Sequence, residues 1–318
     1  MTVSGMPFDD VRALLSQIKG PDQGAAAGMA AAFAKAGHAG DDLGRLKELA
    51  VWLAATRGRV PPLIGQAGVA LYAATHGFAS GEEDVLAAQR GRVDAVAAGA
   101  AAVSHLCVAN DLSLNVFDLA LDMPSTDITR DAALDERSCA ATIAFGMEAT
   151  AEGGDLLCLG ALGAQAEIAA GAVLAALYEG GEGAFGGETI ARALVCHAGS
   201  LRDPLEVLRR LGGRDIAALT GAILAARAQN IPVILDGLPA LAAAAILQRL
   251  APGAASHCLL ASADTPAMQQ AAAHLQLEPL LAFGVTRGDC SAAALAAAVV
   301  KSAAVLAGGV AEIARRIG

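Results

Sequence analysis

One segment, from Leu208 to Gly237, constrains the fold of this chain more than any other. It reads LRRLGGRDIAALTGAILAARAQNIPVILDG, which predicts a Gly-Gly turn, an Ala-rich helix, a short polar connector and a buried strand ending on Asp236. A helix followed by a buried strand is one unit of a parallel α/β sheet. Ligands of open α/β sheets bind outside the carboxyl ends of the strands, so Asp236 becomes a candidate site residue. The alternative is a structural role, in which Asp236 caps the next helix.

Strand-like and helical segments alternate along most of the chain. The apolar, strand-like segments are residues 69–75, 115–121, 155–160, 232–237 and 257–262. This alternation predicts an α/β fold with a doubly wound, mainly parallel, Rossmann-like sheet flanked by helices. Residues 1–60 read as helices and predict a small helical lobe, with the C-terminal helix 291–318 as a candidate member. Residues 61–290 then form the α/β domain.

Composition and charge exclude several classes of function. The net charge of −10 argues against nucleic acid as a partner, because phosphate binding needs a basic face. Asp9 and Asp10 stand where a signal peptide needs an apolar core. The best apolar runs, 238–247 and 292–300, are shorter than the about 18 residues of a membrane span. We therefore expect a cytoplasmic protein without a membrane partner. The charged fraction of 17% is below the roughly 25% of an average domain, which either oligomerisation or an Ala-rich composition explains.

Neither a metal site nor a cofactor is predicted. The six cysteines are widely spaced, without a C-x-x-C pair, so buried reduced thiols are expected. The turn GALG, residues 160–163, lacks the G-x-G-x-x-G spacing of a dinucleotide site. Its amides could contact a phosphate at the start of the next helix, or the turn could be an ordinary tight connection. His76 directly follows the strand 69–75, where it could contact substrate or serve as a structural histidine.

Taken together, these segments resemble one family, the nicotinate-nucleotide:dimethylbenzimidazole phosphoribosyltransferases of cobalamin lower-ligand synthesis. The resemblance covers essentially the whole chain and is strongest over 124–160 and 204–247. Asp236 and Gly237 match the family's V-L-D-G. The resemblance implies a large Rossmann-like sheet, a small helical domain and a symmetric homodimer.

Several loops depart from the family pattern, so the chain resembles a divergent member. The family's G-E-M-G-I-G-N-T reads GALGAQAE here, which keeps Gly160 and Gly163 but has Ala161 in place of the glutamate. The family's A-x-D-H-G-V becomes ATHGF, which keeps His76. Its base-pocket sequence S-A-Y-P-Q-E-V-T becomes ASGEEDVL at 79–86. Loss of the aromatic residue and the proline predicts a reshaped pocket for the aromatic base.

The loop VTRGDCSAA, residues 285–293, resembles the family's M-R-L-G-E-G-T-G-A-A. The resemblance implies that Asp289 is the general base, and that Arg287, Gly288 and Ser291 bind substrate. Backbone contacts to phosphate would come from Gly288 and the glycines of the 160–163 turn. Aspartate is one methylene shorter than glutamate, a loss of roughly 1.5 Å in reach. A misplacement of this size can cost about 100-fold in rate. A catalytic Cys290 is a weaker alternative, because no base is identifiable near it.

The resemblance implies transfer of phosphoribosyl from nicotinate mononucleotide to a benzimidazole-type base, giving α-ribazole phosphate and nicotinate. The partners are then a small-molecule nucleotide and an aromatic base. No metal is needed, because the positive charge of the nicotinium ring already activates the leaving group. Two alternatives remain open on the sequence. One is a non-catalytic paralogue that binds a ligand or pairs with an active relative in a heterodimer. The other is a related glycosyl transfer to a different base.

Overall fold

The computed structural model describes residues 6–79, 85–178 and 184–317. Its centre is a six-stranded, all-parallel sheet with the strand order β2-β1-β3-β4-β5-β6. The strands are β1 (Ala67–Ala74), β2 (Ser113–Asp118), β3 (Leu156–Gly163), β4 (Val233–Leu235), β5 (Cys258–Ser262) and β6 (Pro279–Leu281). The predicted doubly wound α/β fold is confirmed. The predicted strand at 115–121 begins earlier and ends at Asp118.

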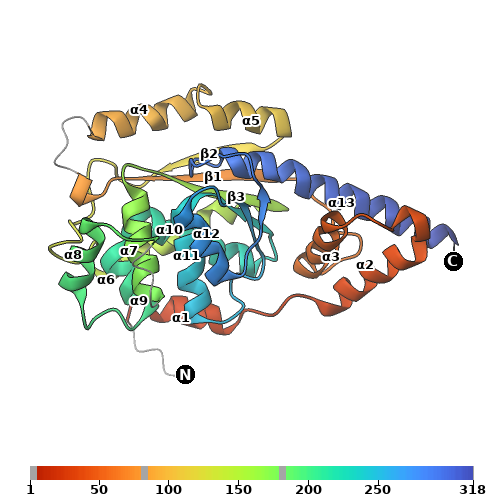
Figure 1. Ribbon diagram of the computed structural model, residues 1–318, viewed down its shortest axis with the longest axis horizontal. Helices are drawn as coiled ribbons and strands as arrows, with labels where there is room; N and C mark the ends of the chain where they lie inside the picture. The colour runs from red at the N-terminus through yellow and green to blue at the C-terminus, as the bar shows by residue number, and fades with distance from the viewer. Residues whose placement is uncertain (1–5, 80–84, 179–183, 318) are drawn as a thin grey trace.

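Helices cover both faces of the sheet (Figure 1). Their bounds are α1 Asp9–Ser16, α2 Gln23–Ala36, α3 Arg45–Arg57, α4 Val85–Ala97, α5 Ala102–Asn110, α6 Glu136–Gly146, α7 Ala166–Leu177, α8 Glu188–His197, α9 Pro204–Val207, α10 Gly213–Ala228, α11 Gly237–Leu250, α12 Pro266–Leu275 and α13 Ser291–Ile317. Helices α7, α10, α11 and α12 contribute to one core, and α4, α5 and α13 to the other.

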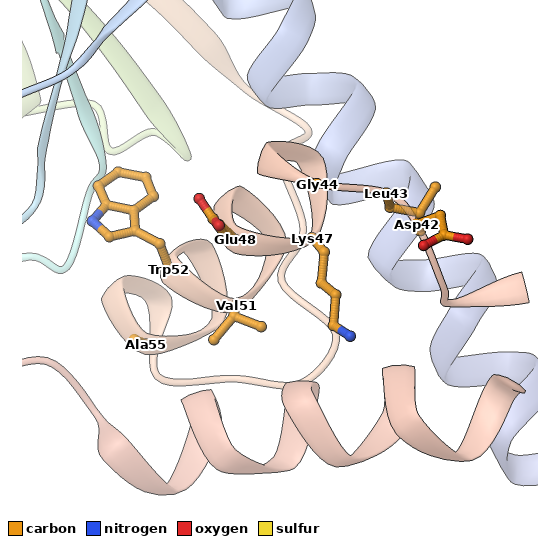
Figure 2. Close-up of a pocket in the computed structure, with 8 residues that line it drawn as sticks. All are labelled: Asp42, Leu43, Gly44, Lys47, Glu48, Val51, Trp52 and Ala55. Carbon is orange, nitrogen blue, oxygen red and sulfur yellow. The ribbon is translucent and has the colours of Figure 1, made fainter.

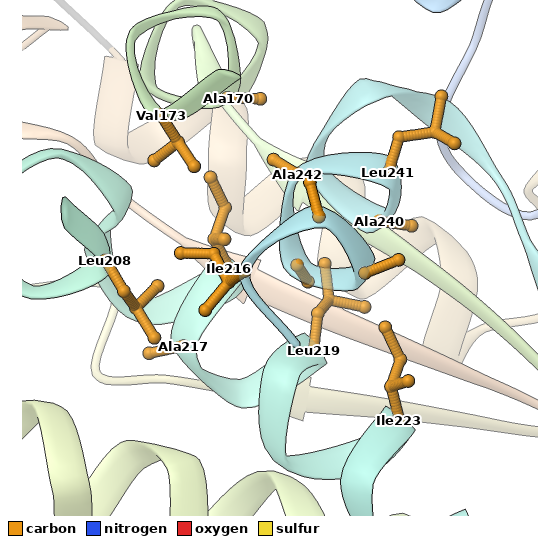
Figure 3. Packing of buried hydrophobic residues seen from close by; sticks show 14 of the residues in the cluster. Ala170, Val173, Leu208, Ile216, Ala217, Leu219, Ile223, Ala240, Leu241 and Ala242 are labelled. Carbon is orange, nitrogen blue, oxygen red and sulfur yellow. The ribbon is translucent and has the colours of Figure 1, made fainter. Parts of the chain in front are cut away.

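The side chains of β1 alternate between these two cores. Tyr72 and Ala74 belong to the core shared with α7, α10 and α11, whereas Leu71 and Ala73 belong to the core shared with α13. A strand buried on both faces reads as a continuous apolar run, which is why VALYAA could be recognised in the sequence. Figure 3 shows the first core, where Ile216 and Leu219 of α10 lie among apolar side chains of the neighbouring helices.

A third hydrophobic cluster joins α2, α3 and the later part of α13, at the right of Figure 1. Met29 and Phe33 of α2 are fully buried there, together with Ala307 of α13. Helix α1 lies elsewhere, because its Val11 and Leu15 belong to the main core. The division into domains at residue 60 stays a prediction.

Two helical stretches have the length and hydropathy of a membrane span, Val85–Asn110 and Ser291–Ile317. The second is α13, whose buried side chains pack against the sheet and against α2 and α3. This packing is that of a core helix in a globular fold. The first stretch consists of α4 and α5, which are separate helices on either side of Gly99.

The carboxylate of Asp155 ties α3 to the start of β3. Its Oδ1 accepts from Arg57 Nη2 at 2.5 Å, and its Oδ2 accepts from the amides of Gly65 at 2.9 Å and Gln66 at 3.0 Å. Burial opposes the charge, but the backbone hydrogen bonds and Arg57 outweigh it and lower the pKa of Asp155. A lowered pKa stabilises the fold above the unfolded-state value, and this stabilisation is lost as the pH falls through the folded-state value.

We therefore expect Asp155→Asn to lower the free energy of unfolding by about 2 kcal/mol at pH 7. The difference from wild type should shrink as the pH drops below about 4. Urea denaturation at pH 7 and pH 3.5 measures both values. Asp94→Asn, the same change on an exposed position of α4, is the control and should have little effect at either pH. An equal loss at the two pH values would contradict the role of the charge.

Candidate active site

The strand order makes the carboxyl ends of β1 and β3 a topological switch point, the place where an open α/β sheet has its ligand crevice. From β1 the chain continues to β2, which lies on one side of β1 in the sheet. It then crosses to β3, which lies on the other side of β1. Such a reversal is a topological switch point, where open α/β sheets bind ligands. Ala74 and Gly163, the last residues of the two strands, are partners in the sheet register. His76 follows β1 directly, so the predicted residues His76 and Gly163 lie at this crevice.

His76 is held by a carboxylate that the sequence did not indicate. Its Nε2 lies 3.1 Å from Oδ2 of Asp215, and both side chains are buried. Asp215 is in the first turn of α10, and its Oδ1 accepts from the amide of Ile216 at 2.9 Å. The other ring nitrogen, Nδ1 of His76, has no hydrogen-bond partner among the described residues. Asp215 therefore fixes the orientation of the imidazole through Nε2, while Nδ1 is left without a hydrogen bond among the described residues.

Glycine is required where the backbone passes these side chains. Gly213 has a φ of +79°, and a Cβ there would lie 2.8 Å from Cε1 of His76. A Cβ on Gly163 would lie 2.8 Å from Oδ2 of Asp215. At Gly160 a Cβ would lie 2.7 Å from Sγ of Cys290. These distances are too short for real side chains, so the glycines allow α10 and the loop before α13 to approach β3 closely.

The loop before α13 crosses the end of β3 and brings Asp289 to the crevice. The carbonyl of Gly288 accepts a hydrogen bond from the amide of Ala161 at 3.0 Å, so that amide already has a partner within the protein. Oδ1 of Asp289 accepts from the amide of Ser291 at 3.1 Å, at the start of α13. Oδ2 pairs with Nε of Arg287 at 2.9 Å. Asp289 is 6% exposed, while the side chain of Arg287 is 71% exposed. The cation and the helix N-terminus both complement the negative charge of Asp289.

The side chain of Cys290 belongs to the apolar core around α13. It is fully buried and has a φ of +64°, a conformation that glycine adopts more easily. Burial, with Asp236 as the next cause, raises the pKa of the Cys290 thiol well above its ordinary value. A thiolate nucleophile is therefore disfavoured, and the alternative of a catalytic Cys290 loses support.

Asp236 lies beneath the same loop, at the end of β4. Its Oδ2 accepts from the amide of Ala293 at 2.8 Å, which ties β4 to the first turn of α13. The side chain makes no cap of the following helix α11, contrary to the structural alternative drawn from the sequence. Its Oδ1 has no hydrogen-bond partner among the described residues, although the residue is fully buried. Burial, together with Asp289 and Glu167, raises the pKa of Asp236 to about 7, against the opposing effect of the hydrogen bond from Ala293.

Glu167, in the first turn of α7, is a further carboxylate that the sequence reasoning missed. A Cβ built on Gly288 would lie 3.8 Å from its Oε1, so Glu167 faces the loop that carries Asp289. The side chain keeps solvent-exposed surface. Burial by the surrounding protein, with a contribution from Asp215, nevertheless raises the pKa of Glu167 to about 7. The family motif has threonine at this position, so the resemblance gave no signal.

All the site residues predicted from the sequence lie at this one edge of the sheet. They are His76, Gly160, Gly163, Asp236, Arg287, Gly288, Asp289 and Ser291. The glycines also have a packing role, as the distances above show. The altered base-pocket sequence is only partly visible, because residues 80–84 lie outside the described residues.

A hollow of about 620 Å³ lies elsewhere, on the outer face of α3 (Figure 2). Lys47, Glu48 and Trp52 line it. The indole nitrogen of Trp52 donates to the carbonyl of Ser256, just before β5, at 3.1 Å. This contact places the hollow toward the amino ends of the strands, the edge opposite Asp289. It is therefore separate from the candidate active site.

Comparisons with known proteins give the class and then the family. A family model described as phosphoribosyltransferase matches residues 18–315. The nicotinate-nucleotide–dimethylbenzimidazole phosphoribosyltransferase of Sinorhizobium medicae (strain WSM419) is 46% identical over 332 residues, covering 99% of this chain and 98% of that protein. The protein of the same name from Agrobacterium fabrum (strain C58) is 45% identical, with 98% and 95% covered. The chain belongs to the family of nicotinate-nucleotide–dimethylbenzimidazole phosphoribosyltransferases.

Solved structures agree with this assignment. The crystal structure of the enzyme of that name from Thermus thermophilus superposes with a TM-score of 0.81 at 27% identity, over 90% of this chain and 96% of that one. A second structure from the same organism, named CobT, gives a TM-score of 0.74 at 26% identity, with 95% and 96% covered. The family resemblance seen in the sequence is thereby confirmed.

Proposed function

We propose that this chain transfers the phosphoribosyl group of nicotinate mononucleotide to a benzimidazole-type base, giving α-ribazole phosphate and nicotinate. The observation that carries the proposal is the match to enzymes of this name over 99% of the chain, at 46% identity. An azole nitrogen of the base attacks C1′ of the nucleotide. The bond from C1′ to the nicotinate nitrogen breaks, and its electron pair leaves with nicotinate. The proton of the other azole nitrogen passes to a carboxylate of the protein.

Asp289 is our proposal for that carboxylate. It occupies the sequence position of the family's base, and it lies at the carboxyl edge of the sheet, where α/β folds bind ligands. Its contacts to Arg287 and to the amide of Ser291 hold it in one orientation. Each carboxylate oxygen keeps a second lone pair, so these contacts leave room for one from the base. A positioned base contributes about 10² to 10⁴ in rate.

The remaining crevice residues are proposed to bind substrate. Nδ1 of His76 has no hydrogen-bond partner among the described residues and is a candidate for a contact with the nucleotide. Gly163 stands just before α7, whose N-terminal amides favour a phosphate. Arg287 supplies an exposed positive charge beside Gly288. A homodimer in the cytoplasm, without metal or cofactor, stays part of this proposal.

Steady-state release of nicotinate tests the proposal. Purified protein, shown to be folded by circular dichroism, is incubated with nicotinate mononucleotide in the presence and absence of dimethylbenzimidazole. We expect release that depends on the base and saturates with both substrates. Release that is absent with both substrates present, from folded protein, would overturn the proposal for this substrate pair. Release that is equal without the base would indicate hydrolysis instead.

A further inference from the structure

Helix α10 begins at the crevice with a cation that the proposed reaction does not use. Arg214 is the second residue of α10 and is half-buried. Its Nη1 donates to the carbonyl of Met123, in the loop that follows β2. Among the described residues no carboxylate pairs with this guanidinium, in contrast to that of Arg287, which pairs with Asp289. Arg214 therefore brings a positive charge without a carboxylate partner to the carboxyl edge of the sheet.

The unpartnered ring nitrogen of His76 lies beside the first residue of the same helix. A Cβ built on Gly213 would stand 3.0 Å from Nδ1 of His76 and 2.8 Å from its Cε1, so glycine leaves this space open. His76 is 2% exposed, and its Nδ1 has no hydrogen-bond partner among the described residues. Buried polar atoms are nearly always hydrogen-bonded, so Nδ1 indicates a polar partner next to the amino terminus of α10.

The amino terminus of a helix favours an anion. Its first amides lack partners within the helix, and the helix dipole adds to their attraction for negative charge. The acid in the first turn of α10, Asp215, is already engaged, with one oxygen on a backbone amide and the other on His76. Gly163, just before α7, lies near the same ring, since a Cβ there would be 3.5 Å from Nε2 of His76. An anion beside His76 therefore meets the start of α10, its cation Arg214 and the nearby start of α7.

The nucleotide of the proposed function carries a phosphate that fits these donors. Resting on that proposed function, we propose that this phosphate binds at the amino terminus of α10, between the guanidinium of Arg214 and Nδ1 of His76. Arginine keeps further N–H groups beyond the one that it gives to Met123, and charge-assisted bonds to phosphate are strong. With Asp215 at Nε2 and the phosphate at Nδ1, the imidazole lies between two anions, which favours its protonated form. Asp289 stays the carboxylate that accepts the azole proton.

Arg214→Gln should weaken the binding of the nucleotide through its phosphate alone. Loss of a charge-assisted contact to phosphate is expected to raise the dissociation constant of nicotinate mononucleotide by about 10- to 100-fold. Arg214→Lys keeps the charge and should lose less. Arg137→Gln is the matched control, because Arg137 holds the same second position in α6 and is exposed. It should bind the nucleotide as the wild type does.

Isothermal titration with three ligands, without the acceptor base, identifies the group that Arg214 binds. Nicotinate mononucleotide carries a phosphate and a carboxylate, nicotinate riboside only the carboxylate, and nicotinamide mononucleotide only the phosphate. We expect Arg214→Gln, shown to be folded by circular dichroism, to weaken both mononucleotides by a similar factor and to leave the riboside unchanged. A loss that is equal for all three ligands, a loss that follows the carboxylate, or no loss at all overturns the assignment.

Magnetic resonance of isotope-labelled histidine nitrogens tests the contact with His76. In the complex with nicotinate mononucleotide, both ring nitrogens of His76, identified by comparison with His76→Gln, should carry a proton. A neutral ring in the complex overturns donation by Nδ1.

Failure of the proposed function is distinguishable from failure of this assignment. If the wild type binds no nicotinate mononucleotide, the proposed function fails. Inorganic phosphate then still tests the subsite, because its binding to the wild type should be lost in Arg214→Gln. Phosphate that binds neither protein, or both equally, overturns the subsite. Base-dependent turnover with an unchanged KM for the nucleotide in Arg214→Gln overturns the subsite and leaves the proposed function standing.

Discussion

Replacing Asp289 by asparagine is expected to lower kcat/KM for base-dependent nicotinate release by about 100-fold or more. Asparagine has nearly the same shape and can still accept the hydrogen bond from the amide of Ser291, so the start of α13 should persist. It cannot take a proton from the azole nitrogen, and it loses the charge pair with Arg287. The variant therefore removes the proposed chemistry with little change in structure.

Two companion variants sharpen this prediction. Asp289→Glu keeps a carboxylate and restores the length found in the family motif, so it should retain turnover. Asp94→Asn makes the same chemical change on the exposed face of α4 and should leave turnover unchanged. Initial rates at several concentrations of both substrates give kcat/KM for each protein. An Asp289→Asn variant that turns over like wild type would show that another group accepts the proton.

The second large effect concerns the crossing of α6 and α10. A methyl group on Gly221 of α10 would overlap the backbone carbonyl of Ile143 in α6. In the reverse direction, a methyl group on Gly146 of α6 would overlap the carbonyl of Ala218. The two helices therefore pack backbone to backbone. Gly221→Ala must push them apart, and we expect it to lower the free energy of unfolding by about 3 kcal/mol.

Gly309→Ala is the matched control for this substitution. Gly309 lies in α13, is exposed, and has no atom within 4 Å of the position where a Cβ would stand. Alanine favours a helix over glycine by about 0.5 to 1 kcal/mol, so this variant should be neutral or slightly more stable. Urea denaturation of both variants measures the difference. A Gly221→Ala protein as stable as wild type would contradict the close helix crossing.

The centre of the fold was predictable because its central strands β1, β3 and β4 are buried on both faces. The apolar run at 69–75 and the run before Asp236 belong to β1 and β4, and both end close to where the sequence indicated. The carboxyl ends of parallel strands meet at one edge of a sheet. Because Asp236 and His76 each follow a predicted strand, the sequence placed both residues at that edge. The structural alternative for Asp236 was wrong, because its side chain holds α13 and does not cap the adjacent α11.

Glu167 and Asp215 could not be found in the same way. Each is a single acidic residue in the first turn of a helix, a position where acidic residues are common for reasons of helix stability alone. Only the packing of α7 and α10 against the end of β3 brings them to the crevice. The raised pKa of Glu167 is likewise a tertiary effect, since burial causes most of it. The backbone of Cys290, with its positive φ, is equally invisible in the sequence.

The fate of an isotopically labelled ribose tests the central claim most directly. Nicotinate mononucleotide carrying the label in its ribose is incubated with dimethylbenzimidazole and folded protein, and the products are separated by chromatography. The proposed function predicts that the label appears in α-ribazole phosphate at the rate at which nicotinate is released. Label that appears only in free ribose phosphate, or that stays in the nucleotide, would contradict it.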